Sequence, residues 1–198
     1  MAVAVAVLSV VTACSVDGDA VREPDLSGRL IAGSSFPYGP GTAVPAVALP
    51  GAISDVTFRP LRSANTPSDC TPAAIDTDGA EAIVGPGGPA GGTLTVLLAR
   101  TTDSFDDFRA RQCASFVVGG TVGTTITTRT TDDDGRIVNE RDLSANGTTY
   151  AHVYELVRQE GSVRLYVQNR YGAATLSDAE RAATRTLFAD AAARAFGG

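Results

Sequence analysis

Several residue types with specialised chemistry are rare or missing in this chain of 198 residues. All 16 basic residues are arginine, so there is no lysine, and the chain has no tryptophan and a single histidine. Without lysine, Schiff-base chemistry and the phosphate loop of nucleotide hydrolases are excluded. One histidine, with the three cysteines assigned below to lipid and to a disulfide, leaves no nitrogen and sulfur cluster for a zinc site. We therefore predict no metal and no cofactor.

The overall composition limits the class of the protein and its partners. Hydrophobic residues make up 43% and charged residues 19% of the chain, which is typical of a soluble globular domain. A net charge of -6 disfavours contact with a phosphate backbone, so we expect no nucleic-acid partner. The length allows one domain with a core of its own.

An apolar run at the N-terminus predicts export. Residues 2–13 carry no charge, and this stretch is too short to cross a bilayer as a helix but typical of a signal-peptide core. The run ends in V-T-A-C at residues 11–14, which resembles the bacterial lipobox, whose cysteine receives a diacylglyceryl group. No basic residue precedes the run, so we expect the natural start to lie upstream of Met1. The competing interpretation is a buried strand with an incidental Cys14.

A lipid anchor at Cys14 predicts three parts. We assign residues 1–13 to a lipoprotein signal peptide and residues 42–198 to a single extracytoplasmic domain. Residues 14–41 are rich in Gly, Pro, Ser and Asp without a sustained period, so we predict a flexible, lipid-anchored linker. Two or three acyl chains would hold the protein permanently at the cell membrane or envelope, with the membrane as its first partner.

The two remaining cysteines predict a disulfide. Cys70 and Cys113 form an even pair in a chain expected to reside in an oxidising compartment. Closing a loop of roughly 40 residues stabilises a fold by about 4 kcal/mol in the chain-entropy model. The alternative, a reactive thiol, would require His152 as its base.

Alternating apolar residues predict a sheet. In residues 93–100 both faces are apolar, which indicates a central strand covered on both sides. The expected strands are residues 56–59, 81–84, 93–100, 116–118, 124–131, 136–143, 148–158 and 162–170. Most of these strands follow one another through short turns, which favours antiparallel pairing.

Three helices are expected around this sheet. Residues 46–55 predict one or two helical turns, Ser104 is placed to cap a short helix, and Ser177 with Glu180 forms a capping box that opens a long helix. We therefore predict the α+β class, as a mainly antiparallel twisted sheet with a long C-terminal helix and one or two shorter helices packed on it.

Several of these features together resemble a known family. They are Cys14, the pair Cys70 and Cys113, G-T-L-T-V at residues 92–96, the phenylalanine-containing helix before Cys113, V-R-L-Y-V at residues 163–167 and the alanine-rich final helix. Over roughly residues 46–196 the chain resembles mycobacterial and related actinobacterial lipoproteins built on a domain of unknown function. Such domains are similar in outline to the extracellular sensor domains of mycobacterial receptor kinases. Those sensors commonly carry two disulfides, and this chain can form only one. The resemblance implies an envelope location and supplies no catalytic residues.

Four patterns suggest catalysis or ligand binding and fail on inspection. A hydrolase would need His152 and a G-x-S-x-G elbow, which the chain lacks. D-D-D-G at residues 132–135 and D-T-D-G at residues 76–79 place no acidic ligand at the ends of a calcium loop. G-P-G-G-P-A at residues 85–90 matches the dinucleotide fingerprint, but a strand follows instead of a helix. Glu140 and Glu155 lie on strands that can be neighbours, and cross-strand arginines such as Arg141 or Arg164 explain them without glycosidase chemistry.

Two functions remain open, and an enzyme is not expected. The leading hypothesis is a non-enzymatic binding or sensor module for an apolar or amphiphilic envelope ligand. The alternative is a scaffold that binds an envelope protein without a small ligand. A cavity above about 300 Å³ would favour the first, and an exposed apolar patch over a solid core the second. The candidate pocket residues are the aromatic Phe105, Phe108, Tyr150, Tyr154 and Tyr166, which ordinary core packing also explains.

Overall fold

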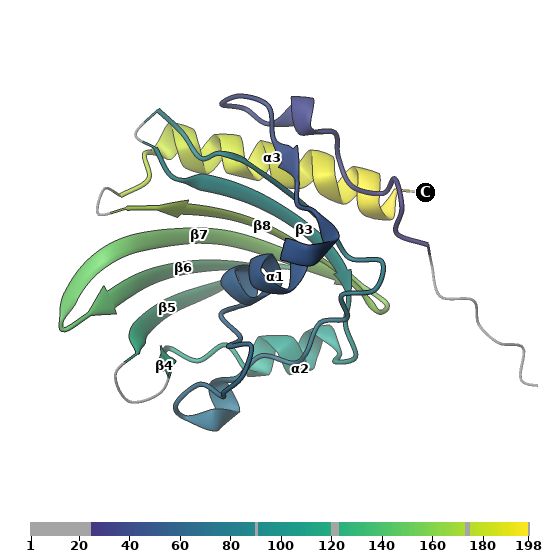
Figure 1. The fold of residues 1–198 in the computed structure, drawn as a ribbon. Helices are drawn as coiled ribbons and strands as arrows, with labels where there is room; N and C mark the ends of the chain where they lie inside the picture. Colours follow the sequence, from purple (N-terminus) through teal and green to yellow (C-terminus); the bar gives the residue numbers. More distant parts are fainter. Residues whose placement is uncertain (1–24, 90, 120–122, 173–174, 198) are drawn as a thin grey trace, which may run out of the picture.

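The computed structural model describes residues 25–89, 91–119, 123–172 and 175–197; the predicted signal peptide and Cys14 lie outside these residues. One antiparallel sheet of eight strands, in the order β1-β2-β3-β8-β7-β6-β5-β4, carries the fold (Figure 1). The strands are β1 Thr42–Ala43, β2 Glu81–Pro86, β3 Thr93–Arg100, β4 Ser115–Val118, β5 Thr124–Asp133, β6 Arg136–Ala145, β7 Thr148–Glu160 and β8 Val163–Tyr171. The α-helices are α1 Leu49–Thr57, α2 Phe105–Ala110 and α3 Asp178–Phe196. The α+β prediction is confirmed.

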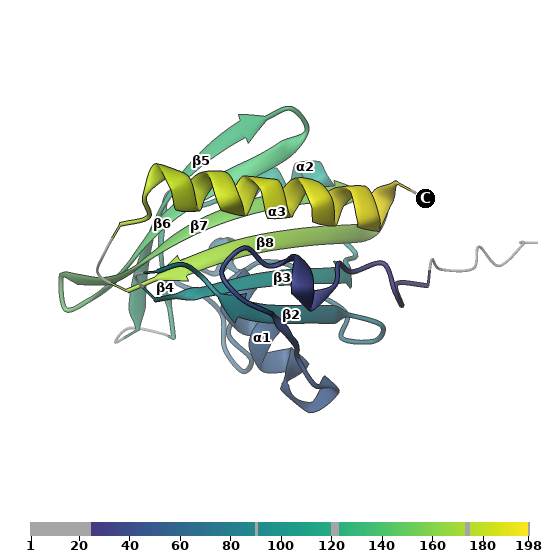
Figure 2. The ribbon, with the colours of Figure 1, turned by 90° about the horizontal axis from the view of Figure 1, so that it is seen from above.

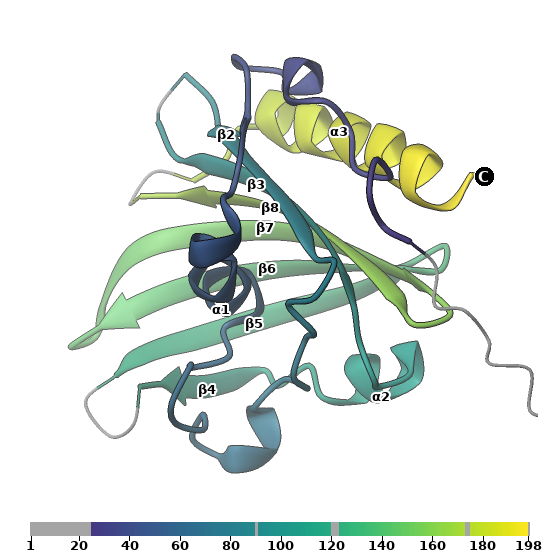
Figure 3. The ribbon, with the colours of Figure 1, turned by 45° about the vertical axis from the view of Figure 1, so that its right-hand side comes forward.

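Helices α3 and α1 lie on opposite faces of the sheet (Figures 2 and 3). On β3, Leu94, Val96 and Leu98 pack with Leu187 and neighbouring residues of α3. The alternate residues of β3, Leu97 and Ala99, pack instead with α1. The strand of residues 93–100 is therefore covered on both faces, as its sequence predicts.

The capping box at the start of α3 is present. The Ser177 hydroxyl accepts the backbone N–H of Glu180 at 3.3 Å, and the Glu180 carboxylate accepts the backbone N–H of Ser177 at 2.8 Å. Because these bonds satisfy N–H groups that have no partner within the helix, they fix where α3 begins. A buried hydrogen bond from Asn169 of β8 to Thr184 at 3.1 Å then ties the helix to the sheet.

Two local predictions differ from the structure. The expected strand at residues 56–59 does not form, because α1 continues to Thr57 and Phe58 ends it with a left-handed backbone at φ 57°. Residues 25–41, assigned to a flexible linker, instead pack on the domain. Leu26, Ile31 and Phe36 are buried in the α3-side core, and Arg194 of α3 donates to the Gly28 carbonyl at 3.1 Å. Isolated apolar residues without a period carry no helix or strand signal, although they bury well individually.

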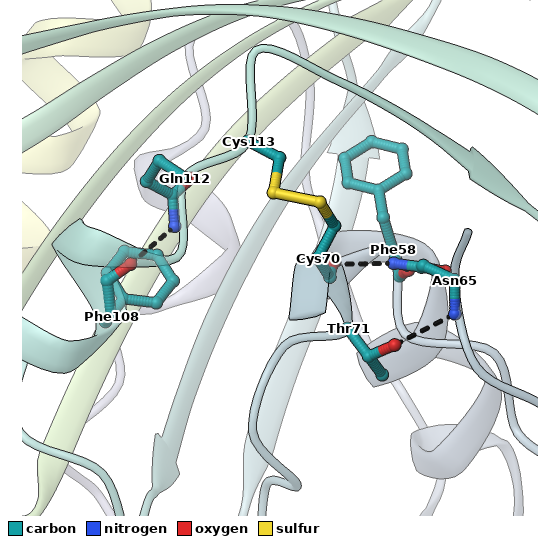
Figure 4. The surroundings of a disulfide bond; sticks show 7 residues. All are labelled: Phe58, Asn65, Cys70, Thr71, Phe108, Gln112 and Cys113. Atoms are coloured by element: carbon teal, nitrogen blue, oxygen red, sulfur yellow. Dashed lines mark hydrogen bonds between the residues drawn. A yellow bond between two sulfur atoms is a disulfide. The ribbon is translucent and has the colours of Figure 1, made fainter. Parts of the chain in front are cut away.

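The predicted disulfide joins Cys70 to Cys113 and lies on the α1 side of the sheet (Figure 4). The Asn65 side chain donates to the carbonyls of Phe58 and Cys70 at 3.1 and 2.9 Å, which orders the loop before Cys70. Gln112 donates to the Phe108 carbonyl at 2.9 Å at the end of α2. The disulfide thus links two irregular segments that have few regular backbone hydrogen bonds to hold them.

We predict that Gly88→Ala destabilises the domain. A Cβ at Gly88 would lie 2.0 Å from the Tyr171 hydroxyl and 2.4 Å from a Glu180 carboxylate oxygen, both buried groups. The free energy of unfolding, measured by urea denaturation, should fall by about 1–3 kcal/mol. Gly51→Ala, in α1 with open space at the Cβ position, should raise it by about 0.5–1 kcal/mol. Equal effects of the two substitutions would contradict the close packing at Gly88.

We also predict that Glu180 makes stability depend on acid pH. Hydrogen bonds from the side chain and backbone of Ser177, and from the Tyr171 hydroxyl, hold the pKa of Glu180 below its ordinary value. The resulting stabilisation is fully present above the unfolded-state pKa of about 4.3 and is lost as the pH falls through the lower folded-state pKa. Urea denaturation between pH 6 and 3 should show a shallower loss for Glu180→Gln than for the wild type. Asp178→Asn, in the exposed first turn, serves as control, and an unchanged profile for Glu180→Gln would refute the assignment.

Candidate functional site

A cleft of about 460 Å³ opens beside α3, on the face of β5, β6 and β7 that the helix does not fully cover. We call it the polar cleft. Its lining comes from three strands and from the segment that leads into α3. The lining residues are Thr127, Thr128, Arg129, Glu140, Arg141, Asp142, His152, Val153, Tyr154, Thr175, Leu176 and Arg181. A volume of this size is within the range of small-molecule sites.

The strand register aligns the polar side chains of the cleft in two rows. Thr127, Asp142 and His152 stand opposite one another across β5, β6 and β7. Two residues further along, Arg129 of β5, Glu140 of β6 and Tyr154 of β7 form the second row. Directly opposed residues of neighbouring strands share one face, so both rows point to the side on which α3 lies.

Ion pairs organise the charges of the cleft. The Glu140 carboxylate accepts Nη1 of Arg129 at 3.2 Å with one oxygen and Nη1 of Arg181, from α3, with the other. In the neighbouring row, Nδ1 of His152 lies 2.6 Å from the Asp142 carboxylate. The single histidine of the chain therefore lies at the cleft with a carboxylate beside it, which fixes the orientation of its ring.

Tyr154 forms the part of the cleft next to α3. Its side chain is 1% exposed, and the guanidinium carbons of Arg181 and Arg185 lie 5.2 and 5.6 Å from the centre of its ring. The Tyr154 hydroxyl is buried, and no described residue hydrogen-bonds to it. An unsatisfied buried hydroxyl costs about 1–3 kcal/mol, so this part of the protein holds unused hydrogen-bonding capacity.

The five aromatic residues predicted to line a pocket do not lie together. Phe105, Phe108 and Tyr166 lie on the α1 side, where the Phe108 ring is 6.0 Å from Phe105 and 6.1 Å from Tyr166. Phe108 and Tyr166 are core residues, and burial raises the pKa of Tyr166 to about 12. Core packing therefore explains these residues.

Tyr154 alone of the five lines the polar cleft. Strict period-two alternation would place Tyr150 on the same strand face as Tyr154, but a bulge shifts the β6–β7 register between Leu143 and Ser144, and Tyr150 lies within it. The side chain of Tyr150 is bonded to Thr124 at 2.9 Å and does not line the cleft. One inserted residue breaks the period-two alternation on which the prediction depended.

The polar residues of the cleft were missed as a group. In the sequence, positions 127 and 129, and positions 140 and 142, alternate as polar residues on one face of each predicted strand. That pattern is normal for the solvated face of a sheet, so it carries no functional signal alone. Knowing which strands α3 leaves uncovered requires the tertiary structure.

A buried polar network occupies the opposite face of the same strands. Arg141 and Glu155 form an ion pair at 2.5 Å, with side chains 7% and 1% exposed. Glu155 also accepts Asn139 at 2.8 Å, and Arg141 donates to Gln112 at 3.0 Å. Gln112 precedes Cys113, so the network ties the disulfide region to the sheet. Glu155 and Glu140 face opposite sides of the sheet, and therefore they do not form a pair of catalytic carboxylates.

Two further kinds of site were considered for the described residues, a metal site and a membrane-spanning helix. No three His, Cys, Asp or Glu side chains among them are grouped to hold a metal ion. Within the same part of the chain, no helix has the length and apolar character needed to span a bilayer.

We predict that removing one member of the Arg141–Glu155 ion pair destabilises the fold. Glu155→Gln leaves a buried guanidinium without its counter-ion, which should lower the free energy of unfolding by about 3–5 kcal/mol. The double variant Arg141→Met, Glu155→Leu should recover most of that loss, because both charges are gone. Glu160→Gln, which breaks the half-exposed pair with Arg158, should cost less than about 1 kcal/mol in the same urea titration. Equal costs for Glu155→Gln and Glu160→Gln would contradict the burial of the first pair.

Comparison with known proteins gives a weak structural likeness. No family model and no curated protein matches the chain. Among solved structures, the chain is similar to an uncharacterized protein of Mycobacterium smegmatis, the Rv0999 ortholog, with 14% sequence identity and a TM-score of 0.40. The match covers 79% of this chain and 85% of the other. A likeness this weak places the chain in no family, so the site itself is the basis for any functional proposal.

Proposed function

We propose that this chain is a non-enzymatic binding or sensor module, exported and anchored by lipid at Cys14, that holds an envelope molecule in the polar cleft. The observation that carries the proposal is the cleft itself, about 460 Å³ in volume and open to solvent beside α3. It exceeds the 300 Å³ or so at which small-ligand sites begin. The lipobox-like end of the apolar run and the resemblance to actinobacterial lipoproteins support the location.

The lining favours an amphiphilic ligand over a wholly apolar one. Arginines, carboxylates, a histidine and threonines supply most of its side chains, while Leu176 and the ring of Tyr154 supply apolar surface. A wholly apolar ligand would strip water from these charges and offer no hydrogen bonds in return. We therefore assign the polar part of the ligand to the cleft.

The order of residues across the strands favours binding over hydrolysis. In a catalytic triad the histidine lies between the nucleophile and the carboxylate, because it takes a proton from the first and is oriented by the second. Here Asp142 lies between Thr127 and His152, so the histidine is two strands from the hydroxyl. At about 4.8 Å per strand their backbones are about 9.6 Å apart, and the Asp142 side chain occupies the position between them.

The scaffold hypothesis rests on a different surface. Val47 and Leu61 are 90% and 67% exposed, and Leu61 borders a groove of about 270 Å³ between α1 and the following loop. Two exposed apolar side chains form a small patch compared with a stable protein interface. The polar cleft therefore supports ligand binding more strongly.

The test is native mass spectrometry of the oxidised full chain after incubation with a total lipid extract of an actinobacterial envelope. We expect a discrete adduct with the wild type. Thr127→Trp should abolish the adduct, because the indole fills the cleft, whereas Thr131→Trp, on the same strand but outside the cleft, should retain it. If the wild type shows no adduct, or Thr127→Trp retains it, the proposal fails, and crosslinking on intact cells would then test for a protein partner.

A further inference from the structure

Two arginine side chains, Arg129 and Arg181, line the polar cleft near α3, and Arg185 lies one helical turn beyond Arg181. Arg181 and Arg185 are one turn apart on α3, and both lie over the ring of Tyr154. Arg129 extends from β5 to the carboxylate of Glu140, which also binds Arg181. Arginines from a helix and from a strand are thus gathered around one carboxylate and one aromatic ring.

Their charge is only partly neutralised. Glu140 is shared by Arg129 and Arg181, and among the described residues no carboxylate lies within ion-pair distance of Arg185. Three positive charges against one negative charge leave an excess of two in this group, although the whole chain carries -6. Three side chains that repel one another are held together here, and an additional anion would relieve that repulsion.

The donors available at this end match a planar or tetrahedral anion. Arg129 and Arg181 each use Nη1 on Glu140, and no hydrogen bond to an acceptor in the described part of the chain involves their remaining N–H groups. Guanidinium forks bind carboxylate and phosphate oxygens in pairs.

The other end of the cleft has the opposite character. Asp142 contributes a negative charge beside His152, and Thr127 contributes a hydroxyl. An anion placed there would be repelled by the Asp142 carboxylate, whereas neutral hydroxyl or amide groups would find both donors and acceptors. The cleft therefore has a polarity, with a basic end at α3 and a neutral-to-acidic end at His152.

We infer that the cleft binds one anionic group, a phosphate or a carboxylate, at Arg129 and Arg181, with Arg185 adding positive charge beside the cleft and the neutral part of the same ligand directed toward His152. This inference rests on the proposed function and specifies its ligand class. The Glu140 carboxylate pairs with Arg129 and Arg181, so it competes with the ligand anion for their charge.

The probe is inorganic phosphate, titrated into the full chain by calorimetry and followed by NMR. We expect saturable binding that weakens as sodium chloride rises from about 50 to 200 mM. Arg129→Gln, which removes a positive charge from the cleft lining, should weaken binding about tenfold. Arg111→Gln removes the same charge from an exposed residue outside the cleft and should leave the affinity unchanged. If the two substitutions weaken binding equally, net charge alone explains the effect and the inference is overturned.

A second variant separates loss of the site from loss of the fold. Glu140→Gln removes the one carboxylate among the three arginines, so phosphate should bind several times more tightly. Unfolding cannot produce such a gain. Weaker phosphate binding by Glu140→Gln would contradict the assignment of the anion to this group.

Vesicles distinguish a lipid headgroup from a soluble anion. Binding to phosphatidylglycerol vesicles but not to phosphatidylcholine vesicles, reduced by Arg129→Gln, would identify the anion as a headgroup, and phosphate binding without vesicle binding would identify a soluble ligand. Either outcome supports the anionic subsite. If neither probe binds while the envelope extract still gives an adduct that Thr127→Trp abolishes, the anion inference is overturned and the proposed function stands.

Discussion

The width of a single helix determines which part of the sheet is available for function. An α-helix with its side chains is about 10–12 Å across, and strands are spaced by about 4.8 Å, so one helix covers two or three strands. Helix α3 packs on β3, β8 and β7, and the same face of β6 and β5 is left open beside it. The polar cleft lies at this boundary, where the covered part of the face ends.

The opposite face of the sheet is closed by different means. Helices α1 and α2 are short, with nine and six residues, so they cannot bury that face alone. On this α1 side, the disulfide and the Arg141–Glu155 network link the intervening loops to the strands. Strands β6 and β7 therefore carry a buried, ion-paired network on one face and a partly paired charge group that lines the open cleft on the other. The first holds the strands in place, and the second remains free to meet a ligand.

The two faces also explain why an acidic protein presents a basic site. Neighbouring residues of one strand point to opposite sides, so Glu140 and Arg141 enter different electrostatic environments. Arg141 is neutralised in the interior by Glu155, while Glu140 is surrounded by arginines, one from β5 and one from α3. Net charge calculated over the whole chain averages these environments and hides the local excess at Arg129, Arg181 and Arg185.

The sequence by itself determined the antiparallel strands, the capping box at Ser177 and Glu180, the central strand with two apolar faces, and the pairing of Cys70 with Cys113. These follow from local periodicity, local capping chemistry and counting, none of which needs distant contacts. The lipid anchor at Cys14 remains a prediction of the same kind. Only the tertiary structure decided that residues 25–41 pack on the domain and that a bulge directs Tyr150 to Thr124. It alone decided that Arg181 of α3 meets Glu140 of the sheet and that Arg185 lies beside the ring of Tyr154. These contacts depend on strand register and on where one helix lies across eight strands, and no local pattern specifies either.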